Sequence, residues 1–64
     1  MDENQVNEIL TKLRNREIEE YLVEKQDFLT FRALLVKQED FKHFRGIAMQ
    51  GGNVIYTYMN EPRS

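Results

Sequence analysis

The sequence contains no cysteine, a single proline and three glycines, and it has no long hydrophobic run. Without cysteine there is no disulfide, no thiolate ligand for zinc or iron–sulfur clusters, and no thiol nucleophile. No apolar segment approaches the ~20 residues that span a bilayer, and the start of the chain lacks the basic and apolar regions of a signal peptide. These absences predict a soluble, cytoplasmic protein with no membrane partner.

Residues for catalysis and metal binding are also scarce. The chain has one histidine, His43, and one serine, Ser64, which is its last residue. A Ser-His-Asp arrangement would need its nucleophile on a frayed tail, which cannot hold the geometry of attack. The acids in 17–24 have neither EF-hand nor facial-triad spacing, and Gly51 and Gly52 lack the lysine of a phosphate-binding loop. We therefore expect no enzyme, no metal site and no cofactor.

The small size of the chain bears on its assembly. A 64-residue domain buries only about 60% of its unfolded surface, and the gain nearly cancels the conformational entropy lost on folding. The composition, with 41% hydrophobic residues and a net charge of −2, is nevertheless typical of a folded chain. We expect one small domain over 1–64 that gains stability by forming a homo-oligomer, most simply a homodimer.

The clearest local pattern is an amphipathic helix over 4–14. Its apolar residues recur at helical spacing, namely Val6, Ile9, Leu10 and Leu13. Asp2 and Glu3 place negative charge at the positive end of the helix dipole. Asn15 is expected to end the helix, because asparagine tolerates the left-handed conformation.

The middle of the chain is ambiguous between helix and strand. Residues 18–23 suit either, and we predict a short strand because Tyr-Leu-Val is a β-prone cluster. Asp27 is expected to cap a following helix, although 29–35 also alternates like a strand. Asp40 is expected to cap a second helical turn, which Gly46 closes.

The end of the chain reads as a β-hairpin. Two β-prone runs, 47–49 and 54–59, flank a Gln-Gly-Gly-Asn turn, and 60–64 is expected to fray because Pro62 cannot donate to a ladder. The predicted fold is α+β, with an N-terminal amphipathic helix, a central capped helical segment and a C-terminal β-hairpin on a small, mostly antiparallel sheet. The alternative is one helix followed by a four-stranded antiparallel meander.

An internal echo occupies the middle of the sequence. Residues 22–32 and 35–45 share the pattern Leu-Val-x3-Asp-Phe-x2-Phe-Arg, with six of eleven positions identical. One interpretation is a pair of equivalent docking elements. The other is a chance match between two caps, each followed by core phenylalanines. Two copies are fewer than a repeat array requires, so no repeat architecture is predicted.

Charge is unevenly distributed along the chain. Residues 1–24 carry a net charge of −4, and residues 25–45 carry a net charge of +2. This asymmetry allows the acidic part of one copy to face the basic part of another. It also allows segment 25–45 to contact phosphates, with tyrosines stacking on bases.

The two tyrosines of the last strand raise a question about its exposed face. Tyr56 and Tyr58 share one side of the strand, and they form an interaction surface if that side is exposed. If it packs on the first helix instead, Ile55, Thr57 and Met59 face outward.

The sequence thus predicts a small protein-interaction or regulatory module that self-associates and binds an unknown protein. The alternative is a weak nucleic-acid-binding protein that uses segment 25–45. The candidate interaction surface combines basic residues with two tyrosines: Arg32, Lys42, His43, Arg45, Tyr56 and Tyr58.

Overall fold

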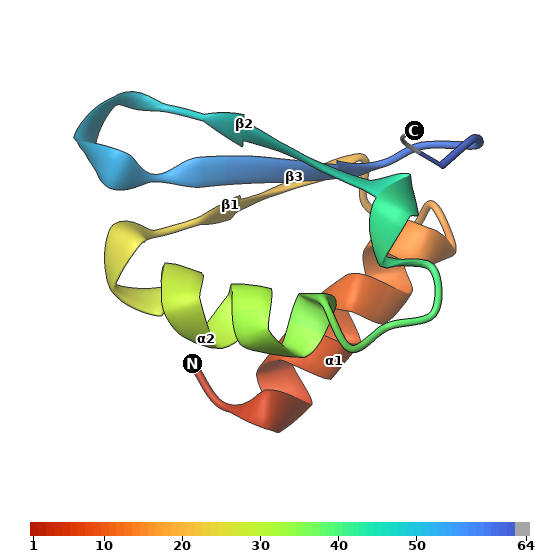
Figure 1. Ribbon diagram of the computed structural model, residues 1–64, viewed down its shortest axis with the longest axis horizontal. Helices are drawn as coiled ribbons and strands as arrows, with labels where there is room; N and C mark the ends of the chain where they lie inside the picture. The colour runs from red at the N-terminus through yellow and green to blue at the C-terminus, as the bar shows by residue number, and fades with distance from the viewer. Residues whose placement is uncertain (63–64) are drawn as a thin grey trace.

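The computed structural model describes residues 1–62 and has an α+β architecture (Figure 1). Its elements are, in chain order, α1 (Glu3–Arg14), β1 (Glu20–Val23), α2 (Lys25–Leu35), the 3₁₀ turn η1 (Phe41–His43), β2 (Phe44–Ala48), the 3₁₀ turn η2 (Gln50–Gly52) and β3 (Val54–Tyr58). The strands form one antiparallel sheet in the order β1-β3-β2, and both helices lie on the same side of it. The predicted fold class is confirmed. The four-stranded alternative is wrong, because 25–35 is a helix.

Helix α1 forms as its periodicity predicts. Asp2 is the N-cap: its Oδ1 accepts a hydrogen bond from the Gln5 N–H at 2.8 Å, and the Gln5 side chain accepts one from the Asp2 N–H at 3.1 Å. This capping box satisfies donors that the first helical turn leaves unpaired. Asn15 is the C-cap, but the left-handed residue is Arg16, with φ of 64°.

The ambiguous region is a strand followed by a helix. The predicted strand is confirmed as β1, but the cap expected at Asp27 is wrong, because α2 begins directly after Glu24. Asp27 lies inside the first turn, where its Oδ1 accepts a hydrogen bond from the N-terminal ammonium of Met1 at 3.4 Å. The carboxylate therefore links α2 to the start of the chain instead of capping a helix.

The internal echo does not correspond to a structural repeat. Its first copy, 22–32, runs from β1 into α2, whereas its second copy, 35–45, runs from the end of α2 through η1 into β2. Asp40 precedes η1 but makes no capping hydrogen bond, and Gly46 is a residue of β2 instead of the end of a helical turn. The two copies are not equivalent elements.

The β2–β3 hairpin is confirmed. Gly51 and Gly52 turn the chain with φ of 79° and 84°, values that glycine adopts readily because it has no Cβ. β2 begins at Phe44, earlier than the sequence indicated. Of the tail expected to fray, Asn60 accepts a hydrogen bond from Arg16, and 63–64 lie outside the described residues.

The two faces of the sheet differ sharply. Strand alternation places Val23, Phe44 and Tyr56 on the inner face, where they are buried against the helices. The core is completed by residues from α1 and α2: Val6, Ile9, Leu10, Leu13, Phe31 and Leu35. The tyrosine side of the hairpin therefore packs inward, and Ile55 and Thr57 lie on the outer face, over which Figure 1 shows no helix from residues 1–62.

Candidate protein-binding groove

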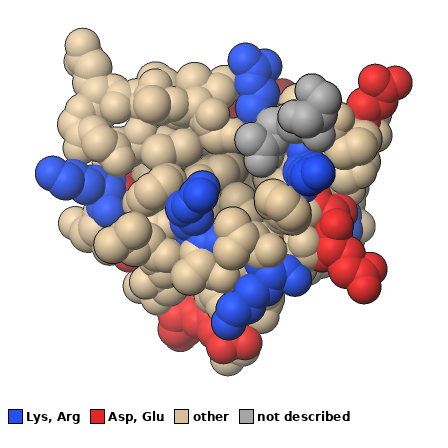
Figure 2. All heavy atoms as spheres, in the orientation of Figure 1, with Lys and Arg blue, Asp and Glu red and all other residues tan. Residues whose placement is uncertain are grey.

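The basic residues of the predicted interaction surface lie on three different elements. Arg32 is exposed on α2, Lys42 is exposed in η1, and Arg45 is exposed on the outer face of β2. On the face seen in Figure 2 the Lys and Arg side chains stand apart from one another, and acids gather along the lower and right-hand margins. The basic segment does not make a continuous cationic track on this face.

The two tyrosines are occupied by packing. Tyr56 is 5% exposed, with its ring centroid 4.9 Å from that of Phe31. Tyr58 is half-buried, and its ring stacks on His43 at 5.2 Å and meets the edge of Phe44 at 4.9 Å. These residues do not form an exposed aromatic platform.

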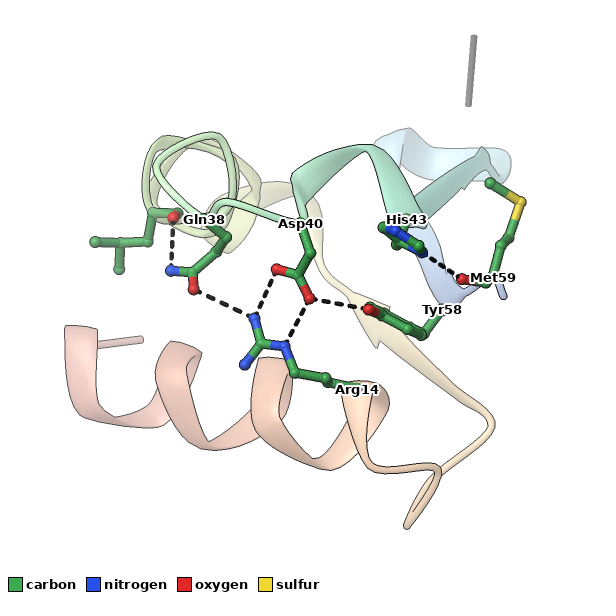
Figure 3. A network of polar contacts seen from close by, with 7 residues as sticks. Arg14, Gln38, Asp40, His43, Tyr58 and Met59 are labelled. Carbon is green, nitrogen blue, oxygen red and sulfur yellow. Dashed lines mark hydrogen bonds and ion pairs between the residues drawn. The ribbon is translucent and has the colours of Figure 1, made fainter. Parts of the chain in front are cut away.

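A polar network joins α1, the α2–β2 connection and β3 (Figure 3). Arg14 donates two hydrogen bonds to Asp40, from Nε at 2.7 Å and from Nη2 at 2.9 Å, and the Tyr58 hydroxyl donates a third at 3.0 Å. The Gln38 side chain accepts a hydrogen bond from Arg14 at 3.3 Å and donates one to the Leu34 carbonyl at 3.2 Å. A bidentate pair of this kind fixes both position and orientation.

The network shifts the titration of its members. The hydrogen bonds from Arg14 hold the pKa of Asp40 below its ordinary value, and the same bonds raise the pKa of Arg14. Burial raises the pKa of Tyr58, and its hydrogen bond to Asp40 adds to the effect. All three groups therefore keep their usual charge at neutral pH, and the network acts as a structural clamp.

The single histidine has a structural position. Its Nδ1 lies 2.8 Å from the Met59 carbonyl oxygen, and the Met59 N–H donates to the carbonyl of His43 at 2.7 Å.

Across residues 1–62 there is no group of three or more His, Asp and Glu side chains placed to hold a metal ion. Over the same range no helix has the length and apolar character needed to cross a membrane.

A groove of about 480 Å³, lined mostly by apolar residues, lies between α2 and the inner side of β2. Aromatic and aliphatic side chains dominate its lining, including those of Phe28 and Leu35 from α2 and of Tyr56 from β3. Gly46 and Ala48 also line it, and both are exposed although they belong to the inner face. The groove is therefore open where the helices do not cover β2.

The backbone of β2 has hydrogen-bonding capacity beside this groove. The N–H groups of Met49 and Met59 donate to carbonyls across the hairpin at 2.8 Å and 2.7 Å. Bonded and non-bonded pairs alternate in an antiparallel ladder, so Gly46 and Ala48 direct their N–H and C=O groups away from β3. In the described sheet β2 is an edge strand, and these groups point outward.

Gly46 leaves space beside β2 for the ring of Tyr56. A Cβ at this position would lie 3.0 Å from Cε1 of Tyr56, tighter than most side-chain contacts, so the ring would have to shift slightly. The ring of Tyr56 cannot retreat easily, because it packs on the buried Phe31. Glycine therefore lets the tyrosine ring lie across β2 and form part of the groove floor.

Arg32 gives the groove its polarity. It is the one charged residue among the described residues that line the groove, and it is exposed. An exposed guanidinium beside an apolar surface favours a ligand that carries a carboxylate next to apolar groups.

A family model described as YkzS-like protein matches residues 3–57 of the sequence. The chain belongs to the YkzS-like protein family. The matched range runs from the start of α1 into β3 and includes the residues of the groove. Neither a curated protein nor a solved structure matches the sequence.

Sequence reasoning identified only part of the groove of this YkzS-like protein. It singled out Arg32 and Tyr56, but it placed Gly46 at the end of a helical turn and gave Ala48 no role. The signal that points to the edge is the run from Phe44 through Ala48, which continues the β-prone segment toward the N-terminus. The order of the strands, which puts β2 at the edge, has no signature in the sequence.

Proposed function

We propose that this YkzS-like protein is a small, non-enzymatic protein-binding module that takes an extended segment of another protein along β2. The observation that carries the proposal is the unpaired backbone edge of β2 directly beside a groove lined mostly by apolar residues. Strand addition to a sheet edge is an established mode of peptide recognition, in which backbone hydrogen bonds give affinity and pockets give specificity.

The strand edge suggests how such a segment would lie, and this pose is part of the proposal. Its backbone pairs with the outward N–H and C=O groups of Gly46 and Ala48, and every second side chain turns toward α2. Those inward side chains enter the groove between Phe28 and Tyr56, which favours apolar residues at alternate positions. A volume of about 480 Å³ lies within the usual range for binding pockets.

The charge beside the groove further restricts the class of partner segment. Arg32 borders the groove, and no acidic residue occurs among its described lining residues. A partner segment with an aspartate or glutamate near its apolar residues gains an ion pair with Arg32 that a basic segment does not. We place this interaction in the cytoplasm, since a chain without cysteine suits a reducing compartment.

The proposal can be tested by selecting short random peptides on the wild-type protein and titrating the selected peptides against wild type and Arg32→Glu. We expect the selected peptides to alternate apolar residues and to carry an acid. On titration the selected peptides should shift the amide resonances of Gly46 and Ala48. The Arg32→Glu substitution should lower the affinity of these peptides by about tenfold or more.

Lys37→Glu is the matched control, because it makes the same charge change just beyond α2 without touching the groove lining. It should weaken the selected peptides by less than about twofold. Peptides that shift residues of the outer face, or that bind Arg32→Glu and wild type equally, would contradict the proposal.

A further inference from the structure

The outer face of the sheet presents a row of aliphatic side chains to solvent. The strand register places Leu22, Ile55 and Ile47 side by side across β1, β3 and β2. Leu22 is 47% exposed and Ile47 is 41% exposed. A contiguous aliphatic row on an open sheet face is typical of an interaction surface.

A second row, next to the first, carries one charge of each sign. Glu20, Thr57 and Arg45 are neighbours across the same three strands, with the acid on β1 and the base on β2. Neighbouring strands lie about 4.8 Å apart, so the backbones of Glu20 and Arg45 are about 10 Å apart, with Thr57 between them. Among the described residues no ion pair involves Glu20 or Arg45, so each charge is available to a partner.

We propose that two copies of the chain pack these outer faces together about a two-fold axis parallel to β3. This rotation sets β1 of each copy against β2 of the other. Leu22 then meets Ile47 of the second copy, and Ile55 meets its own counterpart. Glu20 meets Arg45 of the second copy, and symmetry repeats every contact twice. The face is thus complementary to itself in both apolar pattern and charge.

The charges select this arrangement over the other two-fold packing. An axis perpendicular to the strands also stacks the aliphatic rows, but it moves the charged rows to opposite ends of the interface. Glu20 and Arg45 then find no opposite charge on the facing row. Only the axis parallel to β3 forms the two ion pairs, which is the reason for choosing it.

The small area of the outer face predicts a weak dimer. Three strands of about five residues cover roughly 15 Å by 15 Å. Two such faces bury well under the ~1,200 Å² of a standard interface, so we expect a weak dimer whose population rises with concentration. The surface lies on the opposite side of the sheet from the groove, so this dimer is independent of the proposed peptide binding.

The test is sedimentation equilibrium of the wild-type chain and a charge-swap series, at concentrations up to about 1 mM. We expect Glu20→Arg and Arg45→Glu each to weaken the dimer at least threefold, because each places like charges together. The double variant should regain wild-type affinity within about twofold, since it restores both ion pairs with reversed sign.

Ile55→Glu should abolish dimerisation, with circular dichroism confirming that the fold is kept. Leu29→Glu is the matched control, because Leu29 is 77% exposed on α2, and it should leave the dimer unchanged. A chain that stays monomeric to about 1 mM, or a dimer that survives Ile55→Glu, overturns the proposal. If Ile55→Glu abolishes the dimer but the double charge-swap variant fails to regain wild-type affinity, that result overturns the two-fold axis parallel to β3.

Discussion

Removing the charge of Asp40 while keeping the shape of its side chain tests the polar network directly. We expect Asp40→Asn to lower the free energy of unfolding at pH 7 by about 1–2 kcal/mol. The carboxylate accepts two hydrogen bonds from Arg14 and one from Tyr58. Hydrogen bonds to charged groups contribute about 1.5–3 kcal/mol each. The side chains of Asp40 and Arg14 are 23% and 34% exposed, so solvent screening reduces the total.

The free energy of unfolding lost in Asp40→Asn should become smaller as the pH falls. Arg14 holds the pKa of Asp40 below its ordinary value, so the folded state binds a proton on Asp40 less readily than the unfolded state. The stabilisation is complete above the unfolded pKa of about 3.9, and it is lost as the pH falls through the lower pKa of the folded state. Wild type and Asp40→Asn should therefore converge in stability in strong acid.

Thermal unfolding at neutral and acidic pH measures both effects. For a domain of this size a loss of 1 kcal/mol lowers Tm by about 4–8 °C. Glu39→Gln is the control, since it removes the charge of an exposed neighbour and should change Tm by less than about 2 °C. Equal Tm values for wild type and Asp40→Asn at pH 7, or a difference that persists unchanged in strong acid, would refute the reasoning.

Two further predictions concern the caps and the nucleic-acid alternative. Asp2→Ala should cost about 1 kcal/mol in urea unfolding because Asp2 caps α1, and Asp27→Ala should cost less than half as much because its carboxylate caps nothing. Equal losses would contradict this assignment. Titration with generic single- and double-stranded oligonucleotides should give no binding signal even at low salt. If the protein did bind them, the logarithm of its binding constant would fall against the logarithm of the salt concentration, with a slope of about −0.7 to −0.9 per phosphate contacted. Sub-micromolar, salt-sensitive binding would restore the nucleic-acid alternative.

The elements that the sequence predicts well are those encoded by neighbouring residues. The apolar positions of α1 recur at helical spacing, and the glycines of η2 permit the positive φ values of the hairpin turn. Both signals depend on contacts within a few residues. The α+β fold class follows from them together with the short strand β1.

The errors come from contacts between distant residues. Asp40 resembles an N-cap, but Arg14, which precedes it by 26 residues, takes both of its carboxylate oxygens. Gly46 resembles the end of a helical turn, but the ring of Tyr56 needs the space that its missing Cβ leaves. No local pattern reports either contact.

The candidate site likewise has features that the sequence predicts and features that depend on contacts between distant residues. Arg32 and Tyr56 were recognised by residue type, but the groove exists only because the strand order leaves β2 at the edge and the helices leave its inner side open. Strand order follows from packing of the whole chain. The sequence left open which face of the hairpin is exposed, and of the two tyrosines in the predicted interaction surface Tyr56 is buried and Tyr58 is half-buried.

Hydrogen exchange of the β2 amides tests the central claim most directly. In the free protein at concentrations too low for dimerisation, we expect slow exchange at Arg45 and Ile47, which bond to β3, and fast exchange at Gly46 and Ala48 on the open edge. A saturating peptide from the selection should slow exchange at Gly46 and Ala48 by about tenfold or more. Protection of these two amides in the free protein, or a bound peptide that leaves their exchange unchanged, would contradict strand addition along β2.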